Sequence, residues 1–248
     1  MLREAADQLL DRELPLEDQA AITAAVLADK RIGFFSLSNL DYSRPEQRAQ
    51  EREYIVRWRL EKKDPKAAVS EPKQPITYWL DKNVPEKYRK SVTAGVLEWN
   101  KAFERIGFKD AVQARIQPDD ADFDTLDARH ASIRWMTTAR PAFGGIGPSQ
   151  ADPRTGEILD ADIGIDPTRL RFARYRLADS SMPSPAPASS PLGFPQGDAH
   201  DCRIEDFVAE DRGFASDLLA ARGVIAPDSP EAEEFLLSDL REVTMHEV

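Results

Sequence analysis

The sequence predicts an α+β fold, and three observations lead to this prediction. A helix-like segment at 84–106 has apolar residues spaced by three and four positions. A strand-like segment at 157–166 alternates apolar and polar residues along its whole length. A second helix-like segment with strong start signals follows residue 228. Short strands between these segments would complete a mixed, twisted sheet with a long backing helix.

Composition and charge exclude several classes of protein. The 248 residues are 41% hydrophobic and 31% charged, which is typical of a soluble globular protein, and no apolar run approaches the ~18 residues of a membrane span. The net charge of -11 argues against nucleic acid or an anionic membrane as the main partner. The single cysteine, Cys202, excludes an internal disulfide framework and a cysteine-rich zinc site. The first residues form no signal peptide, since they lead into a charged amphipathic segment.

Residues 1–72 are expected to be the C-terminal part of a preceding domain. Residues 2–28 predict two short helices, separated by a proline. Strands are predicted at 32–37 and 54–60, the second from its clear alternation of apolar and charged side chains. The polar, proline-containing connector at 62–75 predicts a domain boundary, so that 73–248 would form the next domain.

A strand, a helix and two further strands follow the connector. The apolar run at 76–80 predicts a strand, and Pro85 suits the opening of a helix. The helix carries the strongest periodic signal of the chain, a buried stripe of Tyr88, Val92, Val96, Trp99, Phe103 and Ile106. Segments 111–116 and 132–136 predict the next two strands.

The acidic segment at 117–128 invites comparison with a calcium-binding EF-hand loop. Its aspartates have a suggestive spacing at Asp120, Asp122 and Asp124. The sixth loop position is Thr125 where glycine is required, and the twelfth is Ala131 where glutamate is required. A solvated acidic loop is therefore preferred over a calcium site.

A glycine-rich segment and a turn precede the alternating strand. Residues 142–149 predict a flexible link, because they lack the lysine of a phosphate-binding loop and do not open a helix. The order Asp, Pro and then Gly at 152–156 predicts a turn. In the strand at 157–166 one face is apolar and the other polar, which favours an antiparallel or edge strand.

The last part of the chain contains a Pro-rich insertion and a final helix. Residues 176–228 have no clear order, apart from a short helix-like stretch within 204–223. Asp228 and Ser229 then act as candidate helix caps before Pro230. An apolar stripe of Leu236, Leu240 and Val243 follows. His246 is expected to face the interior or a cleft.

The order of these elements resembles the N-terminal half of a metzincin zinc-peptidase catalytic domain. Several stretches are similar, more specifically, to a bacterial zinc-dependent metalloprotease family whose zinc-binding domain is EcxA-like. The similar stretches are 54–62, 76–81, 99–104, 107–108, 133–135, 147–149, 152–159, 161–163 and 246–248. The resemblance covers about 30–166 and 235–248, and the Pro-rich insertion has no counterpart.

This resemblance implies a Zn²⁺-dependent endopeptidase that acts on protein or peptide substrates. The full motif would read H-E-x-x-H-x-x-G-x-x-H, of which the chain contains His246 as a metal ligand and Glu247 as the catalytic base. The remaining ligands would lie past Val248, so the 248 residues are expected to be inactive. His130 and His200 are not expected to replace them.

The resemblance also implies a substrate site and a location. The backbone of the predicted edge strand at Leu159, Asp160 and Ala161 would bind an extended peptide by β-addition. The parent protein would be periplasmic, associated with the envelope, or secreted. The alternative is a non-catalytic binding or structural module of the envelope that keeps the peptidase scaffold.

Overall fold

A computed structural model of the chain describes residues 35–43, 48–137, 145–168, 170–171, 174–175, 214–215, 218–219, 221–226 and 228–248. The two helices predicted within 2–28 lie outside the described residues, as do Cys202, His200 and most of the predicted insertion at 176–228.

A mixed six-stranded sheet forms the centre of the fold. Its strands are β3 (Ile76–Leu80), β4 (Val112–Ile116), β5 (Ser132–Trp135), β6 (Gly145–Ile146), β7 (Ser149–Ala151) and β8 (Ile158–Ile165). The strand order is β4-β3-β5-β8-β6, with β7 also paired to β8. The first four of these strands are parallel, while β6 and β7 run antiparallel to β8. This mixed α/β arrangement with few helices is compatible with the predicted α+β class.

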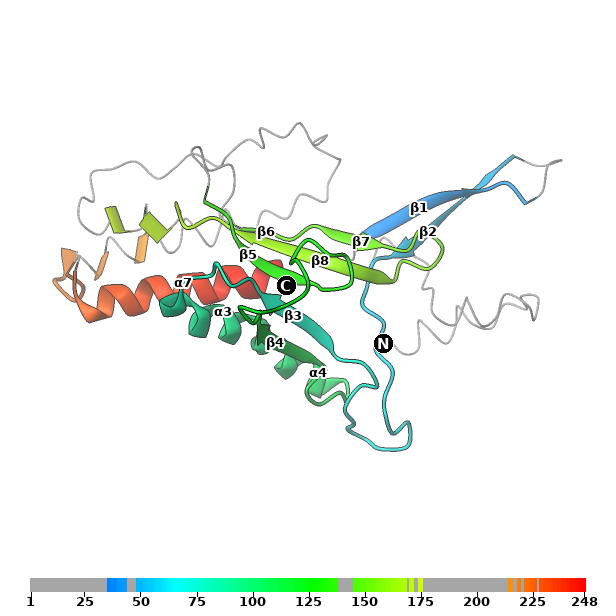
Figure 1. The fold of residues 1–248 in the computed structure, drawn as a ribbon, viewed down its shortest axis with the longest axis horizontal. Helices are drawn as coiled ribbons and strands as arrows, with labels where there is room; N and C mark the ends of the chain where they lie inside the picture. The colour runs from blue at the N-terminus through cyan, green and yellow to red at the C-terminus, as the bar shows by residue number, and fades with distance from the viewer. Residues whose placement is uncertain are drawn as a thin grey trace.

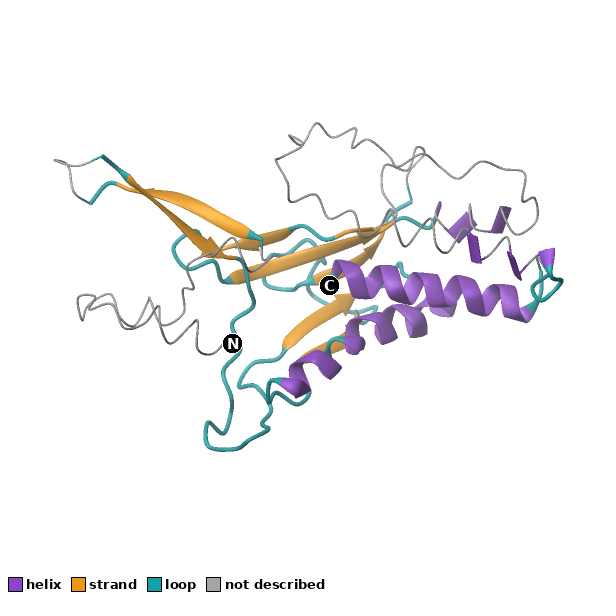
Figure 2. Ribbon diagram, turned by 180° about the vertical axis from the view of Figure 1, so that it is seen from behind, coloured by secondary structure: helices purple, strands orange, loops and turns teal. Residues whose placement is uncertain are grey.

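Helices cover one face of this sheet. Figures 1 and 2 show α3 (Glu86–Glu98) and α7 (Pro230–Glu247) side by side on that face, with the short α4 (Asn100–Arg105) continuing from α3. The single long helix predicted at 84–106 is therefore interrupted, at Trp99, although this residue keeps helical φ and ψ of -59° and -27°. Within the described residues, no helix combines the length and apolar character needed to cross a membrane.

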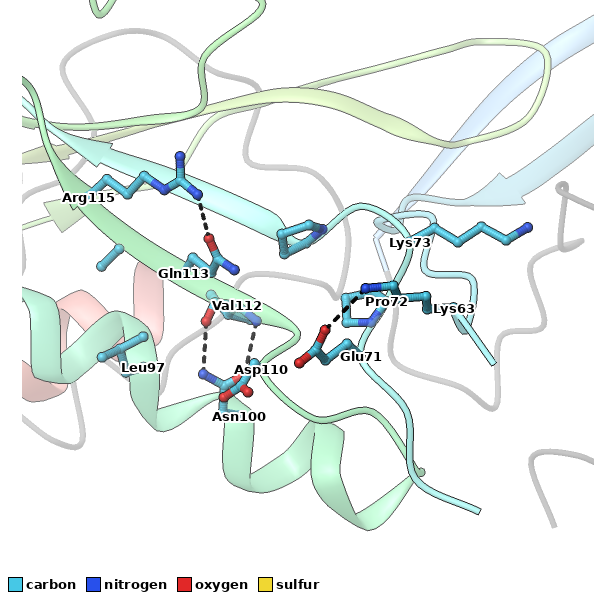
Figure 3. Close-up of a pocket in the computed structure, with 12 residues that line it drawn as sticks. Lys63, Glu71, Pro72, Lys73, Leu97, Asn100, Asp110, Val112, Gln113 and Arg115 are labelled. Carbon is cyan, nitrogen blue, oxygen red and sulfur yellow. Dashed lines mark hydrogen bonds and ion pairs between the residues drawn. The ribbon is translucent and has the colours of Figure 1, made fainter. Parts of the chain in front are cut away.

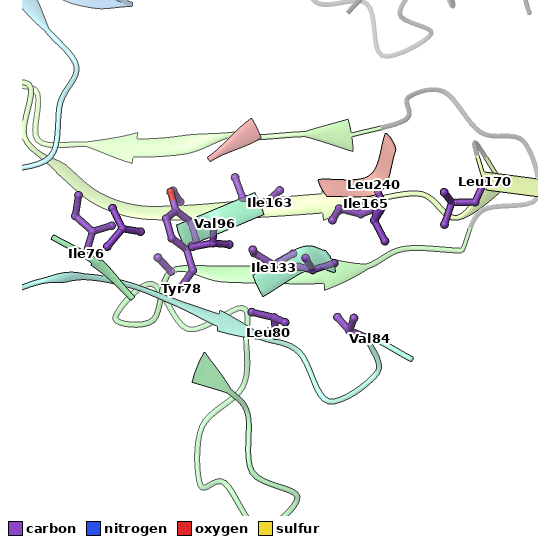
Figure 4. Close-up of a cluster of buried hydrophobic side chains, with 14 of the residues drawn as sticks. Ile76, Tyr78, Leu80, Val84, Val96, Ile133, Ile163, Ile165, Leu170 and Leu240 are labelled. Atoms are coloured by element: carbon purple, nitrogen blue, oxygen red, sulfur yellow. The ribbon is translucent and has the colours of Figure 1, made fainter. Parts of the chain in front are cut away.

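The core lies between the sheet and these two helices. Alternate side chains of β3, β5 and β8 point towards the helices and are almost completely buried, as Figure 4 shows for Tyr78, Leu80, Ile133, Ile163 and Ile165. The helices contribute Val92, Val96, Leu236 and Leu240. The predicted stripe of α3 is confirmed at its buried valines. It is wrong near its end, where Trp99 is 38% exposed and Ile106 is 64% exposed, although Phe103 between them packs against the core.

A separate two-stranded hairpin precedes the sheet and projects away from it (Figure 1). It consists of β1 (Ser36–Asp41) and β2 (Gln50–Ile55). The strand predicted at 32–37 overlaps β1 in its described part. The strand predicted at 54–60 is wrong beyond Ile55, where β2 ends, because the antiparallel register runs from Ser36 opposite Ile55 to Asp41 opposite Gln50. Beyond β2 the chain makes a single bridge, between Arg57 and Glu157, and then enters the connector.

Of the two alternatives predicted for 157–166, the antiparallel strand is confirmed by its pairing with β6 and β7, and the edge strand is wrong. β8 is an inner strand, because β5 pairs with one side of it and β6 and β7 with the other. The predicted flexible link at 142–149 is also wrong in its described part. Residues 145–151 run along β8 as the outer strand of the sheet, and the confirmed turn at 152–156 joins them to β8.

Candidate functional site

His246 and Glu247 occupy the last turn of α7, and the start of this helix follows the predicted signals. The Ser229 hydroxyl accepts a hydrogen bond from the Ala232 N–H at 3.2 Å, and Pro230 opens the first turn. The predicted stripe is buried at Leu236, Leu240 and Val243. Because the stripe anchors α7 on the core, His246 and Glu247 are half-buried where the helix meets the sheet.

Glu247 lies against the outer strand of the sheet. A Cβ atom at Gly145 would be 2.8 Å from Glu247 Cγ and 3.0 Å from its Oε1. At Gly147 a Cβ atom would be 2.5 Å from the Glu247 backbone oxygen and 3.2 Å from Oε2. Only glycine at both positions permits this approach of strand and carboxylate. The sequence analysis interpreted these glycines as a flexible link and therefore missed this contact. The signal that could have revealed it is the spacing of the two glycines, which lie two residues apart as residues on one side of a strand do.

The same end of α7 contacts α3 on another side. A Cβ atom at Gly95 would be 2.5 Å from the Arg241 backbone oxygen and 2.7 Å from Thr244 Cβ. The indole Nε1 of Trp99 donates a hydrogen bond of 2.8 Å to the Met245 carbonyl oxygen. Two elements that are distant in sequence therefore meet at the His-Glu pair. The sequence interpretation had placed Trp99 in an apolar stripe.

The three residues predicted to bind substrate lie in β8. Leu159 is 58% exposed, whereas Asp160 and Ala161 are buried. Gln150 of β7 is opposite Asp160, and Ser149 is opposite Ala161. β7 therefore occupies one side of β8 at these residues, so a peptide could not add to β8 on that side.

Asp160 instead belongs to a polar region on the sheet face opposite the helices. It is 2% exposed, and its Oδ1 has no hydrogen-bond partner among the described residues. Burial raises the pKa of the Asp160 carboxyl, and the nearby carboxylates of Asp162 and Asp127 raise it further. The backbone N–H of Ala161, which donates a hydrogen bond to the carboxyl, and to a smaller extent His130 lower the pKa in part. The carboxylate of Asp162 does have a hydrogen-bond partner, since the Ser132 hydroxyl donates to it.

Replacing Asp160 with asparagine is expected to stabilise the protein at neutral pH. A carboxyl whose pKa is raised by folding loses stability as the pH rises through its folded pKa, and the loss is complete above that value. Asparagine carries no charge, so the variant should gain about 1 kcal/mol at pH 7. The gain should disappear as the pH falls below the unfolded pKa of about 4.

Urea unfolding of Asp160→Asn and wild type at pH 7 and at acid pH measures this difference. Asp119→Asn in the exposed loop is the matched control and should show no comparable gain. A variant that is less stable than wild type at pH 7 would show that the ionised carboxylate is stabilising instead.

His130 lies in an aromatic cluster above this polar face. Its ring stacks on Phe123 with centroids 4.1 Å apart and meets Trp79 edge-on at 6.3 Å. Over the described ranges, no three His, Cys, Asp or Glu side chains are grouped so that they could hold a metal ion. His246 offers one imidazole, and structural or catalytic zinc takes three or four protein ligands. The described residues alone therefore do not fit a zinc site.

A groove of about 770 Å³ opens at the opposite edge of the sheet, beside β4 (Figure 3). Both backbone polar groups of Val112 are occupied there: its N–H donates to Asn100 Oδ1 at 2.9 Å, and its carbonyl accepts from Asn100 Nδ2 at 2.8 Å. Lys63 and Glu71 form an ion pair at 3.8 Å on the wall. No residue of α7 lines the groove, so it is separate from the His-Glu pair.

Comparison with known protein families matches residues 26–63 to a domain of unknown function, DUF5117. The match includes the β1–β2 hairpin and the start of the connector, and it does not reach α7. Comparison with curated proteins and with solved structures gave no match.

Proposed function

We propose that this chain is the N-terminal half of the catalytic domain of a metzincin-like zinc endopeptidase. In this proposal His246 is one zinc ligand and Glu247 is the general base. The observation that carries the proposal is the contact of Glu247 with Gly145 and Gly147. It joins a His-Glu pair on a helix to the outer strand of a sheet, which are the two parts that such an enzyme needs to cut an extended peptide.

The outer strand at 145–151 is the proposed substrate-binding element. Among the described residues it pairs only with β8, and its other edge meets no described strand. An extended peptide could add to this edge through backbone hydrogen bonds. Its scissile bond would then lie near Glu247, whose carboxylate contacts the same strand. This assignment replaces the one made for Leu159, Asp160 and Ala161.

The chemistry divides between the metal and this chain. A bound zinc would lower the pKa of a water molecule and polarise the substrate carbonyl. Glu247 would accept the proton of the attacking water and deliver it to the leaving amine. The packing of its side chain on Gly145 limits the positions that the carboxylate can take, which favours one orientation for this proton transfer.

The second candidate function is a non-catalytic module that retains the scaffold. The coding sequence after Val248 separates the two candidates. Gly-His at once, with another histidine six residues after that one, supports the enzyme, while any other continuation supports the module. The enzyme proposal includes a periplasmic, envelope-associated or secreted location of the parent protein.

The 248-residue polypeptide is expected to bind no stoichiometric zinc and to cleave no peptide, because a single imidazole cannot compete with water and buffer for the metal. A polypeptide that continues through the remaining ligands should bind one zinc per chain and cleave unstructured peptides. Elemental analysis and a quenched fluorescent peptide library measure both properties. Peptidase activity with stoichiometric zinc in the 248-residue chain would contradict the proposal.

A further inference from the structure

We propose that Trp99 is a positioning residue, which holds the end of α7 so that His246 and Glu247 point into the active site. This inference rests on the proposed function. It concerns the contacts that set the orientation of the His-Glu pair, and it assigns a role to a residue of α3 that is distant from α7 in sequence.

The hydrogen bond from Trp99 ends on the residue directly before His246. Trp99 Nε1 donates to the Met245 carbonyl oxygen at 2.8 Å. A carbonyl oxygen has two lone pairs, so it can accept this bond together with one from its own helix. Because a carbonyl is rigidly attached to the following peptide plane, this bond restrains the backbone that carries His246.

Trp99 can act in this way because its own position is well defined. It lies at the junction of α3 and α4, with helical φ and ψ, and its carbonyl accepts from Ala102 at 3.0 Å and from Phe103 at 3.1 Å. The buried side chains of Val92 and Val96 fix α3 on the core. The indole is nevertheless 38% exposed. We therefore attribute the positioning role of Trp99 to its hydrogen bond and not to the burial of its ring.

The helix contact one turn before Trp99 brings α7 close to α3. Gly95 brings the two backbones so close that a Cβ atom would be 2.5 Å from the Arg241 carbonyl oxygen. The Thr244 hydroxyl donates to Leu240 O of its own helix at 2.8 Å, and its methyl group faces Gly95. Gly95 therefore sets the distance between the helices, while Trp99 restrains the last turn.

The outer strand opposes this contact from the other side. Gly145 and Gly147 touch the side chain and the backbone of Glu247. The last turn of α7 is thus held between the strand and Trp99. A half-site of this kind is built before any metal binds, which reduces the ordering cost of binding metal and substrate.

Trp99→Phe removes the donor and keeps an aromatic ring, and Trp99→Leu removes both. In the 248-residue chain, amide hydrogen exchange at 245–248 should become about tenfold faster in both variants, since opening of the last turn loses one restraint. In a polypeptide that contains the whole motif, kcat should fall about tenfold with KM nearly unchanged, because misplaced catalytic groups affect the reacting state more than binding.

Trp79→Phe is the matched control, since Trp79 is half-buried and packs on Phe123, away from α7. It should leave exchange at 245–248 unchanged. Exchange and kcat of Trp99→Phe equal to wild type, with Trp99→Leu impaired, would overturn the inference in favour of ring packing. If the wild-type longer polypeptide neither binds zinc nor cleaves peptides, the proposed function fails, and the exchange measurement alone still decides whether Trp99 holds the helix end.

Discussion

Glu247→Gln, in a polypeptide that continues past Val248 through the remaining ligands, is expected to lower kcat for peptide cleavage by about 10²- to 10⁴-fold. Glutamine has nearly the same shape as glutamate and should fit against Gly145 and Gly147, but it cannot accept a proton from water. Zinc content and the free energy of unfolding should therefore stay close to wild type.

Kinetics with a fluorescent peptide, together with elemental analysis, test this result. Glu234→Gln is the control, because Glu234 is exposed on the same helix and contributes nothing to the proposed site. Full activity in Glu247→Gln would remove the general-base role. Loss of zinc together with activity would indicate instead that the carboxylate contributes to metal binding.

Gly95→Ala is expected to destabilise the fold by about 1–3 kcal/mol, despite the higher helix propensity of alanine. The new Cβ would be 2.5 Å from the Arg241 carbonyl oxygen, which is backbone and cannot turn aside as a side chain could. Either α7 moves away from α3 or the core is strained, and both outcomes cost free energy.

Urea unfolding of the 248-residue chain measures the effect. Lys90→Ala, at an exposed position of α3, controls for changes in helix propensity and should remain within about 0.5 kcal/mol of wild type. Stability of Gly95→Ala at or above the wild-type value would mean that the two helices are free to separate without cost.

The elements whose side chains obey one period could be predicted from the sequence. β3, β4, β5 and β8 appear close to their predicted bounds, and α7 begins at its predicted cap. The turn at 152–156 was also predicted, from the order Asp, Pro and then Gly, and it is confirmed: Gly156 has a φ of +72°, which other residues rarely adopt. The His-Glu pair was identified by its motif, and its functional role stays a proposal.

The wrong predictions concern segments whose structure depends on residues that are distant in sequence and adjacent in space. The alternation of β8 predicted an antiparallel or edge strand with one face open to solvent, yet on that face Asp160 is buried and Asp162 is half-buried, and β7 pairs beside them. Alternation reports which face is apolar, not whether a strand lies on either side. The glycines of the outer strand appeared to be a flexible link for a similar reason, since no local pattern indicates that another backbone approaches.

The sequence alone therefore determined the local elements, the capped start of α7 and the identity of the pair at its end, because periodicity, capping and motif are properties of adjacent residues. Only the tertiary structure decided which strand is outermost, and that Gly95, Trp99, Gly145 and Gly147 meet the last turns of α7. These contacts join residues about a hundred or more positions apart, and their geometry depends on how the sheet and two helices pack together.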